Sequence, residues 1–470
     1  MTLNTLLEEM PITNEQKHLD ISVFGLGKVG LTLAACLASA GHRVVGVDVC
    51  PHLVASINNK TIRSDEPGVK DRLISSLDHL VATMNCEEAV RKTCLSFIIV
   101  PTPSNTFGGF SLRFVLEACR SIGMAIKNKK GNHIVSLVST VLPGSSDQII
   151  IPELEKFSGR KIGDGLGYCY NPSFIALGEI VKGIECPDYV LIGESDSASG
   201  SLVLAAHQSM ISTQIPIARM HPIEAEITKL ASNTHETMRV SFANMLMAAC
   251  SEIPHANVDR ITETLSHRMG KRFFKGAIPF GGPCWPRDNK ALSTFLDAIG
   301  VPSRMPRNVD LFNEEHGAYI LRKILELSKS DSRIGILGLA YKPGTSLIER
   351  SYGIDLIRGL IAERRQIVAW DPMAVPEANK VFNNQIMYAE SGTQCLEESS
   401  ILVIVNPIKE RDSINWSKAK DKTVIDCWRC LTLSQRKQIG HYVALGHGDA
   451  VISTTWETSH LRKRLELLTN

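Results

Sequence analysis

The sequence predicts an α/β protein in which two domains with parallel sheets are joined by a helical segment. Three observations lead to this prediction. Short runs of β-branched and apolar residues alternate with helical stretches toward both ends of the chain. The middle of the chain lacks such runs and shows long helical patterns instead. At 470 residues the chain is also too long for one ordinary hydrophobic core.

The first domain is predicted from the order of its elements. The apolar run ISVFGLGKVG (21–30) leads into glycines, a helix of small and apolar residues follows, and residues 42–49 form a second buried strand. A strand, a helix and a strand within about 30 residues make a βαβ unit with a right-handed crossover. Further β-rich runs follow with helices between several of them, which favours a doubly wound parallel sheet. These runs cover residues 95–100, 133–140, 167–172 and 189–194.

The pattern changes near residue 215 and changes back near residue 330. From His221 to about Gly300 it is helical, and the longest stretch covers residues 224–253. Strand-like runs then return, but the second α/β domain has no complete GxGxxG motif. The runs cover residues 333–341, 365–372, 400–407 and 422–428. We therefore predict an N-terminal extension (1–18), a first α/β domain (19–214), a central helical domain (215–325) and a second α/β domain (326–470).

Composition excludes several classes of protein. Hydrophobic residues make up 44% and charged residues 21%, which is ordinary for a globular domain. A net charge of +2 does not indicate the basic face that nucleic acid requires. There is neither a long apolar run nor a signal-peptide pattern, so we expect a cytoplasmic location and no membrane partner. The twelve cysteines lack disulfide-like spacing, and the one CxxC, Cys427–Cys430, has no second ligand pair nearby, so we predict no metal site.

A dinucleotide fingerprint stands between the first strand and the first helix. Its glycines allow a tight turn and let the backbone approach a pyrophosphate at the helix N-terminus. Asp48 ends the second strand, where its carboxylate can accept hydrogen bonds from a ribose 2′-hydroxyl and would repel a 2′-phosphate. We therefore predict NAD rather than NADP. The fingerprint residues are Gly25, Gly27, Lys28, Val29 and Gly30.

The segment FGGPCWPRD (280–288) contains a candidate nucleophile. Most single cysteines are small hydrophobic residues in a core. Cys284, however, lies between a diglycine and Pro286, which is not the interior of an element. Asp288 follows four residues later and could orient a partner side chain if a helix begins here. We interpret Cys284 as a reactive thiol.

The chain resembles the UDP-glucose/GDP-mannose dehydrogenase family over roughly residues 20 to 450. Eight motifs of the family occur in the family's order, which makes the resemblance specific although each motif alone is weak. They are GLGKVG (25–30), DEPGV (65–69), VPTPSN (100–105), STVLPGSS (139–146), YNPSF (170–174), EAEITKLASN (224–233), FGGPCWPRD (280–288) and GLAYKPGTS (338–346).

The resemblance implies a double oxidation of the C6 hydroxymethyl group of a nucleotide-linked sugar, with a cysteine carrying a thiohemiacetal and then a thioester. It places Cys284 at the nucleophile and Asp288 at the acid that follows it. Lys229 and Asn233 match the pair that stabilises the oxyanion, and their i, i+4 spacing puts both on one face of a helix. Thr140 matches a hydroxyl near the nicotinamide and the catalytic water.

The resemblance also implies two Rossmann-like domains, the first binding NAD and the second binding the nucleotide sugar, and a homodimer formed through the central helix. We expect a UDP-sugar as substrate. Further cofactor-binding residues are predicted to be Pro101, Thr102 and Thr140. The predicted substrate-binding residues are Lys229, Asn233, Phe280, Gly281, Lys342 and Arg429.

Two departures from the family pattern leave alternatives open. The family commonly has glutamates where this chain has Ser173 and Leu177, and the first is thought to help activate the hydrolytic water. One alternative is therefore a catalytically altered nucleotide-sugar binder, or an enzyme that performs one oxidation without efficient thioester hydrolysis. A simple hydroxyacid dehydrogenase ranks lower, because it would have no use for Cys284 or for a third domain.

Overall fold

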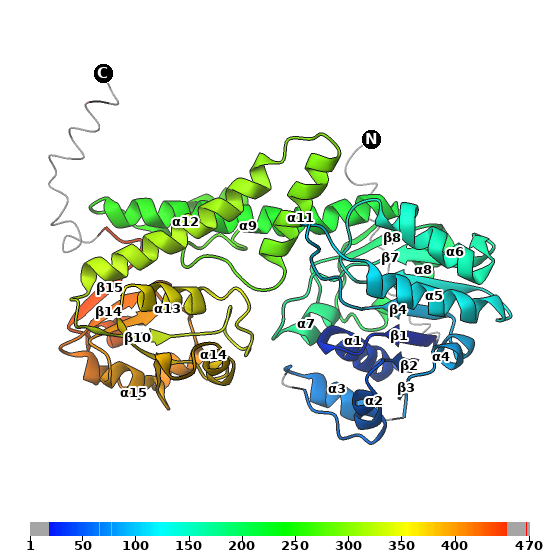
Figure 1. Cartoon of the computed structure of the whole chain (residues 1–470), viewed down its shortest axis with the longest axis horizontal. Helices are drawn as coiled ribbons and strands as arrows, with labels where there is room; N and C mark the ends of the chain where they lie inside the picture. The colour runs from blue at the N-terminus through cyan, green and yellow to red at the C-terminus, as the bar shows by residue number, and fades with distance from the viewer. Residues whose placement is uncertain (1–17, 65, 77, 449–466, 468–470) are drawn as a thin grey trace. The chain divides into compact units, whose positions relative to one another are not determined.

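The computed structural model describes residues 18–64, 66–76, 78–448 and 467. The chain divides into two compact units, Met1–Ala231 and Ser232–Asn470, and the boundary falls within the long helix α9 (Pro222–Glu252). Each unit contains a sheet flanked by helices (Figure 1), as the fold class predicts. Apart from His18, the predicted N-terminal extension lies outside the described residues. The predicted domain limits stay predictions.

The first unit is built on a sheet with strand order β3-β2-β1-β4-β5-β7-β8-β9, and β6 pairs with β7. All six predicted strand runs form strands, whereas β3, β6 and β9 were not predicted. One pairing departs from the predicted parallel sheet, because β8 runs antiparallel to β7. The described strands are β1 (Asp20–Phe24), β2 (Arg43–Val47), β3 (Leu80–Thr83), β4 (Leu95–Ile98), β5 (His133–Leu137), β6 (Lys161–Ile162), β7 (Gly165–Tyr170), β8 (Val190–Glu194) and β9 (Ile217–Met220).

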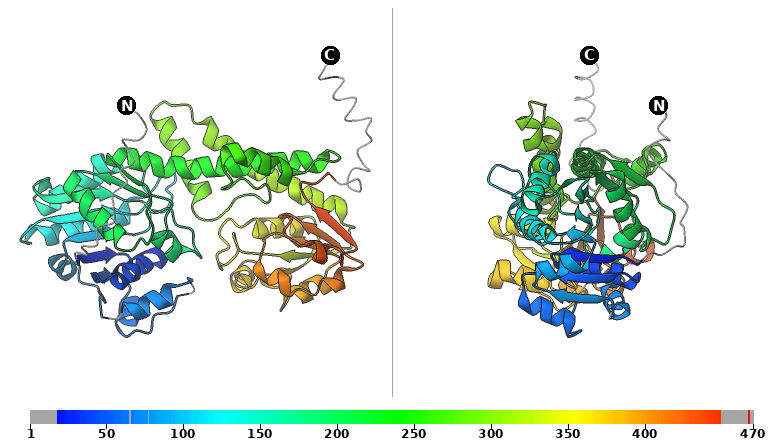
Figure 2. Two further views of the ribbon diagram at one scale, coloured as in Figure 1. Left: turned by 180° about the vertical axis from the view of Figure 1, so that it is seen from behind. Right: turned by 90° about the vertical axis from the view of Figure 1, so that its right-hand side faces the viewer.

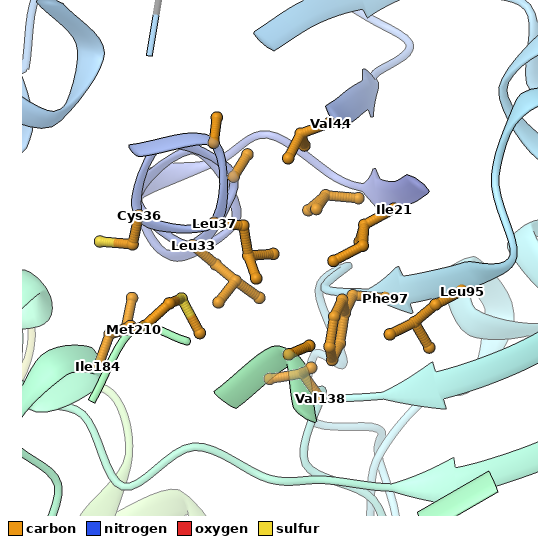
Figure 3. Close-up of a cluster of buried hydrophobic side chains, with 14 of the residues drawn as sticks. Ile21, Leu33, Cys36, Leu37, Val44, Leu95, Phe97, Val138, Ile184 and Met210 are labelled. Atoms are coloured by element: carbon orange, nitrogen blue, oxygen red, sulfur yellow. The ribbon is translucent and has the colours of Figure 1, made fainter. Parts of the chain in front are cut away.

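Helices cover both faces of this sheet. Because strand side chains alternate between faces, Ile21 and Val23 pack in one core and Phe24 packs in the other. Helix α1 contributes Leu33 and Leu37 to the first core, which Figure 3 shows. The helices of this unit are α1 (Lys28–Ser39), α2 (Pro51–Asn58), α3 (Val69–Ser75), α4 (Cys86–Lys92), α5 (Arg113–Lys127), the π-helix η2 (Ser146–Ile150), α6 (Ile151–Ser158), α7 (Ile180–Glu185) and α8 (Ser197–Gln208).

The strand order reverses direction between β1 and β4, which makes their carboxyl ends a topological switch point. The chain leaves β1 for β2 and β3 on one side, and then crosses to β4 on the other side. Dinucleotides bind at such topological switch points in open α/β sheets. The glycine fingerprint follows β1 directly, so the fold places it at this edge.

The second unit repeats this arrangement with a smaller sheet of order β12-β11-β10-β13-β14-β15, in which every pairing is parallel among the residues described. The predicted strand runs of the last third are confirmed, and β12 and β15 are additional. The strands are β10 (Arg333–Leu337), β11 (Gln366–Trp370), β12 (Met387–Tyr388), β13 (Ile401–Ile404), β14 (Thr423–Asp426) and β15 (His441–Ala444). They lie in the yellow to red part of the chain in Figure 2.

Long helices form the central part of the chain, as the sequence predicts. Within the second unit, α9 and α12 are joined by Tyr319, whose hydroxyl donates to Glu252 over 2.9 Å, and by the Lys323–Glu252 ion pair at 2.7 Å. Ile320 and Ile324 of α12 enter the core under the second sheet. The remaining helices are α10 (Val258–Met269), α11 (Trp285–Ala298), α12 (Arg304–Leu327), α13 (Tyr352–Ala362), α14 (Val375–Phe382), α15 (Gly392–Glu397) and α16 (Leu433–Arg436), with short 3-10 helices at Asn383–Gln385, Lys409–Ser413 and Trp416–Ala419.

No helix among the described residues has the length and apolar content to cross a membrane.

Candidate active site

The three glycines of the fingerprint occupy the positions that a pyrophosphate loop requires. Gly25 has φ +90°, and a Cβ there would lie 2.2 Å from the carbonyl oxygen of Ile99. A Cβ at Gly30 would lie 1.8 Å from the carbonyl oxygen of Gly25, so α1 can approach the strand only with glycine here. Gly27, the N-cap of α1, has open space on its Cβ side. A phosphate can therefore reach the first amides of α1, at Lys28 and neighbouring positions.

Asp48 lies just beyond β2, at the same edge of the sheet. One carboxylate oxygen accepts a hydrogen bond from the Leu26 amide at 2.7 Å, and the other accepts from the Cys50 amide at 2.9 Å. The carboxylate therefore holds the glycine loop against the end of β2. Two carboxylate oxygens offer about four acceptor sites, so capacity for ribose hydroxyls remains. Arg43 stands at the opposite end of β2, where it pairs with Asp20.

Thr102 and Thr140 come together at the ends of β4 and β5. The Thr102 hydroxyl donates to the Thr140 carbonyl over 2.8 Å, and Ser139 exchanges hydrogen bonds with the Val100 backbone. The neighbouring Ile99 packs on Gly25, so these loops border the glycine fingerprint. The predicted cofactor residues of the three loops thus lie along one sheet edge. Their chemistry fits NAD, since a phosphate could approach the first amides of α1 past Gly27 and the Asp48 carboxylate offers acceptors to a ribose.

Lys229, on α9, is 8% exposed and lies over the loop that follows β7. Its Nζ donates to the carbonyl oxygen of Ser173 over 2.7 Å and stands 4.5 Å from the centroid of the Phe174 ring. The lysine predicted to stabilise an oxyanion is therefore held by the segment in which the chain departs from the family pattern. Leu177, further along that segment, packs against the core of the first unit.

In the second unit, Cys284 caps the N-terminus of α11. It is exposed, and its carbonyl accepts the first helical hydrogen bond from the Asp288 amide at 2.8 Å. A helix does begin here, as required for the predicted role of Asp288. The positive end of the helix dipole stabilises negative charge at such a position, which favours a thiolate.

Asp288 is fully buried and binds Asn233. The Asn233 amide nitrogen donates to one carboxylate oxygen over 2.6 Å, and the Arg287 Nε donates to the other over 2.9 Å. The structure thus joins two predicted catalytic residues. Asp288, one helical turn after Cys284, orients the Asn233 amide. The sequence did not reveal the part played by Arg287.

The diglycine before Cys284 packs against the loop between β10 and α13. A Cβ at Gly281 would lie 2.0 Å from the carbonyl oxygen of Arg350, and one at Gly282 would lie 2.7 Å from the Tyr341 ring. That loop also carries Lys342, which is half-buried. Within the second unit, the predicted substrate loop and the cysteine loop are therefore in contact.

Arg429 has a different environment from the one predicted. Its guanidinium is buried and pairs with Asp259, with Nε 2.9 Å from a carboxylate oxygen. Nη2 also donates to the other Asp259 oxygen over 3.1 Å, and the remaining three donors bind the carbonyl oxygens of Gly276, Cys427 and Leu445. All five donors of the fork are thereby engaged within the protein, which favours a structural role. Its part in substrate binding stays a prediction.

Sequence reasoning assigned no role to several buried polar residues near these positions. Glu226, fully buried on α9, accepts hydrogen bonds from the Gly144 amide at 2.6 Å and from the amide and hydroxyl of Ser146. Burial raises its pKa, against those hydrogen bonds. The glutamate ties the loop after Thr140 to the helix that carries Lys229. The sequence signal that could have revealed this role was a charged residue, Glu226, on the face of a helix expected to be buried.

The fold and these sites define a dehydrogenase of the two-Rossmann-domain class, in which the first domain suits NAD and the second follows the loop that carries Cys284. Three family models match the chain. The NAD binding domain of the UDP-glucose/GDP-mannose dehydrogenase family matches residues 19–211, its central domain matches residues 223–315, and its UDP binding domain matches residues 335–433. The chain belongs to the UDP-glucose/GDP-mannose dehydrogenase family.

Similar proteins agree with this membership. The UDP-glucose 6-dehydrogenase AglM of Haloferax volcanii is 30% identical over 88% of this chain and 97% of its own length. A GDP-mannose 6-dehydrogenase of Pseudomonas syringae pv. tomato is 30% identical over 86% of this chain and 95% of its own. The solved structure of a UDP-glucose dehydrogenase from Pyrobaculum islandicum superposes with a TM-score of 0.83 at 28% identity, covering 93% and 99% of the two chains.

The family confirms the resemblance, the three-domain α/β fold, and NAD as cofactor. The chain is an NAD-dependent nucleotide-sugar dehydrogenase. The roles of its individual residues stay predictions.

Proposed function

We propose that this enzyme oxidises the C6 hydroxymethyl group of a UDP-linked sugar to a carboxylate, with Cys284 as the nucleophile. The observation that carries the proposal is the placement of Cys284 at the N-terminus of α11, next to the buried Asn233–Asp288 pair. A dehydrogenase that stops at the aldehyde needs no thiol. The UDP-sugar is favoured because the UDP binding model of the family covers residues 335–433.

NAD bound at the glycine loop and Asp48 would supply the hydride acceptor, one molecule for the C6 alcohol and, after exchange, a second molecule for the thiohemiacetal. Between these oxidations the Cys284 sulfur forms a bond to the aldehyde carbon, and the aldehyde oxygen becomes an alkoxide that takes up a proton. Lys229 and Asn233 supply donors for that oxygen, and one such donor is commonly worth about 3 kcal/mol. Asp288 accepts a hydrogen bond from the Asn233 amide and so fixes the orientation of that side chain.

Hydrolysis completes the reaction. Water adds to the thioester carbon, the carbon–sulfur bond breaks, and Cys284 leaves as a thiolate while the sugar leaves as a carboxylate. The Thr140 hydroxyl is our candidate for holding the water. Ser173 and Leu177 supply no carboxylate base at the two positions where the family commonly has glutamate. This observation favours a second candidate function, a single oxidation with poor hydrolysis.

We further propose a homodimer in which α9 meets a second copy of the chain. The helix exposes large apolar side chains that a monomer would leave in water, including Phe242 at 42% and Met245 at 44% exposure. Light scattering coupled to size exclusion should give twice the mass of 51.6 kDa. A monomeric mass at micromolar concentration would contradict the dimer.

The function is tested by supplying NAD with a panel of UDP- and GDP-linked sugars and measuring NADH and product mass. The proposal expects two NADH per sugar and a uronic acid product with at least one UDP-sugar. One NADH with free aldehyde supports the second candidate, and no NADH with any sugar contradicts both.

A further inference from the structure

The segment 276–280, which leads into the cysteine loop, belongs to no helix or strand. Its backbone is nevertheless hydrogen-bonded, and the partners are side chains. The Asn244 side chain accepts from the Ala277 amide at 2.7 Å and donates to the Ile278 carbonyl over 3.1 Å. Asn244 lies on α9 and is fully buried. One amide side chain thus acts as a strand partner would.

Asn313 of α12 holds the other end of this segment in the same way. It accepts from the Phe280 amide at 2.8 Å and donates to the Phe280 carbonyl over 2.9 Å. His316, one turn further along α12, binds the Ala277 carbonyl at 2.8 Å through Nε2. Burial lowers the pKa of His316 to about 4, so the ring is neutral and acts as a donor to that carbonyl. Pro279 has no amide hydrogen to satisfy.

The same face of α9 also holds the start of α11. Asn233 binds Asp288, and Thr234 donates to the Asn289 side chain over 2.8 Å. Asn244 lies eleven residues after Asn233, which is close to three helical turns. Side chains of one helix therefore fix the chain both before and after Cys284.

We propose that Asn244 and Asn313 are positioning residues that hold Cys284 at the N-terminus of α11. The proposal rests on the proposed function insofar as Cys284 is the nucleophile. Three residues (281–283) separate Phe280 from Cys284, so a shift of the segment 276–280 would reach the sulfur. Displacements of about 1 Å can cost about a hundredfold in rate. His316 and Arg429 also bind carbonyls of this segment, at Ala277 and Gly276, so the loss of one amide should loosen the segment without releasing it.

Asn313 is the position to test, because it is half-buried and its variants should fold. Asn313→Asp keeps the acceptor for the Phe280 amide and removes the donor to the carbonyl, whereas Asn313→Ala removes both. A matched control exists in the first unit. Asn58 clamps Ala82 through the same pair of bonds, each 2.8 Å long. Asn58→Asp therefore removes an equivalent bond far along the chain from Cys284.

Steady-state kinetics with the best UDP-sugar should show kcat lowered about tenfold in Asn313→Asp and further in Asn313→Ala, with the KM for NAD within about twofold of wild type. Asn58→Asp should keep kcat within about twofold. Unchanged kcat in both Asn313 variants, or an equal loss in Asn58→Asp, would overturn the proposal.

A second readout does not depend on dehydrogenase activity. Alkylation of Cys284 by iodoacetamide, followed by peptide mass analysis, should slow by about threefold in both Asn313 variants, because the thiolate loses its fixed place at the helix end. The rate in Asn58→Asp should match wild type. If no nucleotide sugar is oxidised, the proposed function fails while this rate still decides the positioning role. Equal alkylation rates in all four proteins would overturn it.

Discussion

The Asn233 side chain donates to the Asp288 carboxylate over 2.6 Å, and both residues are buried. The contact joins α9 to the first turn of α11, directly after Cys284. A buried carboxylate that accepts from an amide on one side and from Arg287 on the other fixes the direction of that amide.

Asp288→Asn should lower kcat by about 10- to 100-fold and leave the KM for NAD within about twofold, because the carboxamide cannot anchor both donors. Asp297→Asn, near the other end of the same helix, is the control and should retain activity. The measurement is steady-state NADH production with a UDP-sugar. A variant with wild-type kcat would show that the carboxylate orients nothing that matters for turnover.

Cofactor choice should depend on Asp48. We expect kcat/KM for NAD to exceed that for NADP by at least about tenfold, which corresponds to about 1.4 kcal/mol. Asp48→Asn should reduce the ratio, because the amide no longer repels a 2′-phosphate. Asp20→Asn, whose carboxylate pairs with Arg43 at the far end of β2, should leave the ratio unchanged. Similar kcat/KM values for the two cofactors in wild type would show that Asp48 does not distinguish a ribose 2′-hydroxyl from a 2′-phosphate.

Removal of the thiol should separate chemistry from binding. Cys284→Ala should abolish carboxylate formation, with less than a few per cent of wild-type turnover, as expected when a covalent nucleophile is lost. Binding of NAD and of the nucleotide sugar, measured by calorimetry, should change little since no binding group is removed. Cys186→Ala, at another exposed cysteine, is the control.

Stability should carry a pH signature from Asp310 of α12. Burial raises its pKa to about 6, against a hydrogen bond from Asn289 and the charge of Arg350. The unfolded value is about 3.9, so the folded state binds this proton more tightly. The resulting stabilisation is full below about pH 4 and is lost as the pH rises through 6. At neutral pH the buried, ionised Asp310 carboxylate therefore lowers the stability of the folded state.

Asp310→Asn keeps an acceptor for Asn289 and cannot titrate. Its Tm relative to wild type should be higher at about pH 7.5 than at about pH 4.5, by a few degrees. Asp355→Asn, an exposed residue of α13, should show no such trend. Thermal melts at the two pH values test this, and parallel shifts at both would contradict it.

Much of the fold could be predicted because its signals are local. The ISVF run, the glycines at 25, 27 and 30, and Asp48 lie within one βαβ unit, and the structure places them as predicted. The antiparallel direction of β8 had no such signal, because strand direction depends on the connection and not on the strand. Arg429 was assigned to substrate from its position after β14, but the carbonyls that bind it come from distant segments. The roles of Asn244 and Asn313 could not be predicted either, because the backbone groups they bind lie more than 30 residues away along the chain.

The final prediction concerns hydrolysis, where the chain departs from its family. General-base assistance to water is worth about 10²- to 10⁴-fold. Neither Ser173 nor Leu177 carries a carboxylate. The Ser173 carbonyl accepts a hydrogen bond from the Lys229 Nζ, and Leu177 is partly buried against the core of the first unit. Glu179 is exposed at the N-cap of α7, where it lies 3.5 Å from Lys182.

We expect the enzyme to complete the oxidation with hydrolysis as the slow step. Rapid mixing should give a burst of NADH, followed by slow turnover that reaches two NADH per sugar. Intact-mass analysis during turnover should find a sugar-nucleotide adduct, and Cys284→Ala should lack it. Ser173→Glu should then remove the burst by accelerating the second phase, because it restores a carboxylate where the family has one. Two NADH per sugar in wild type with neither burst nor adduct would show that another residue activates the water fully.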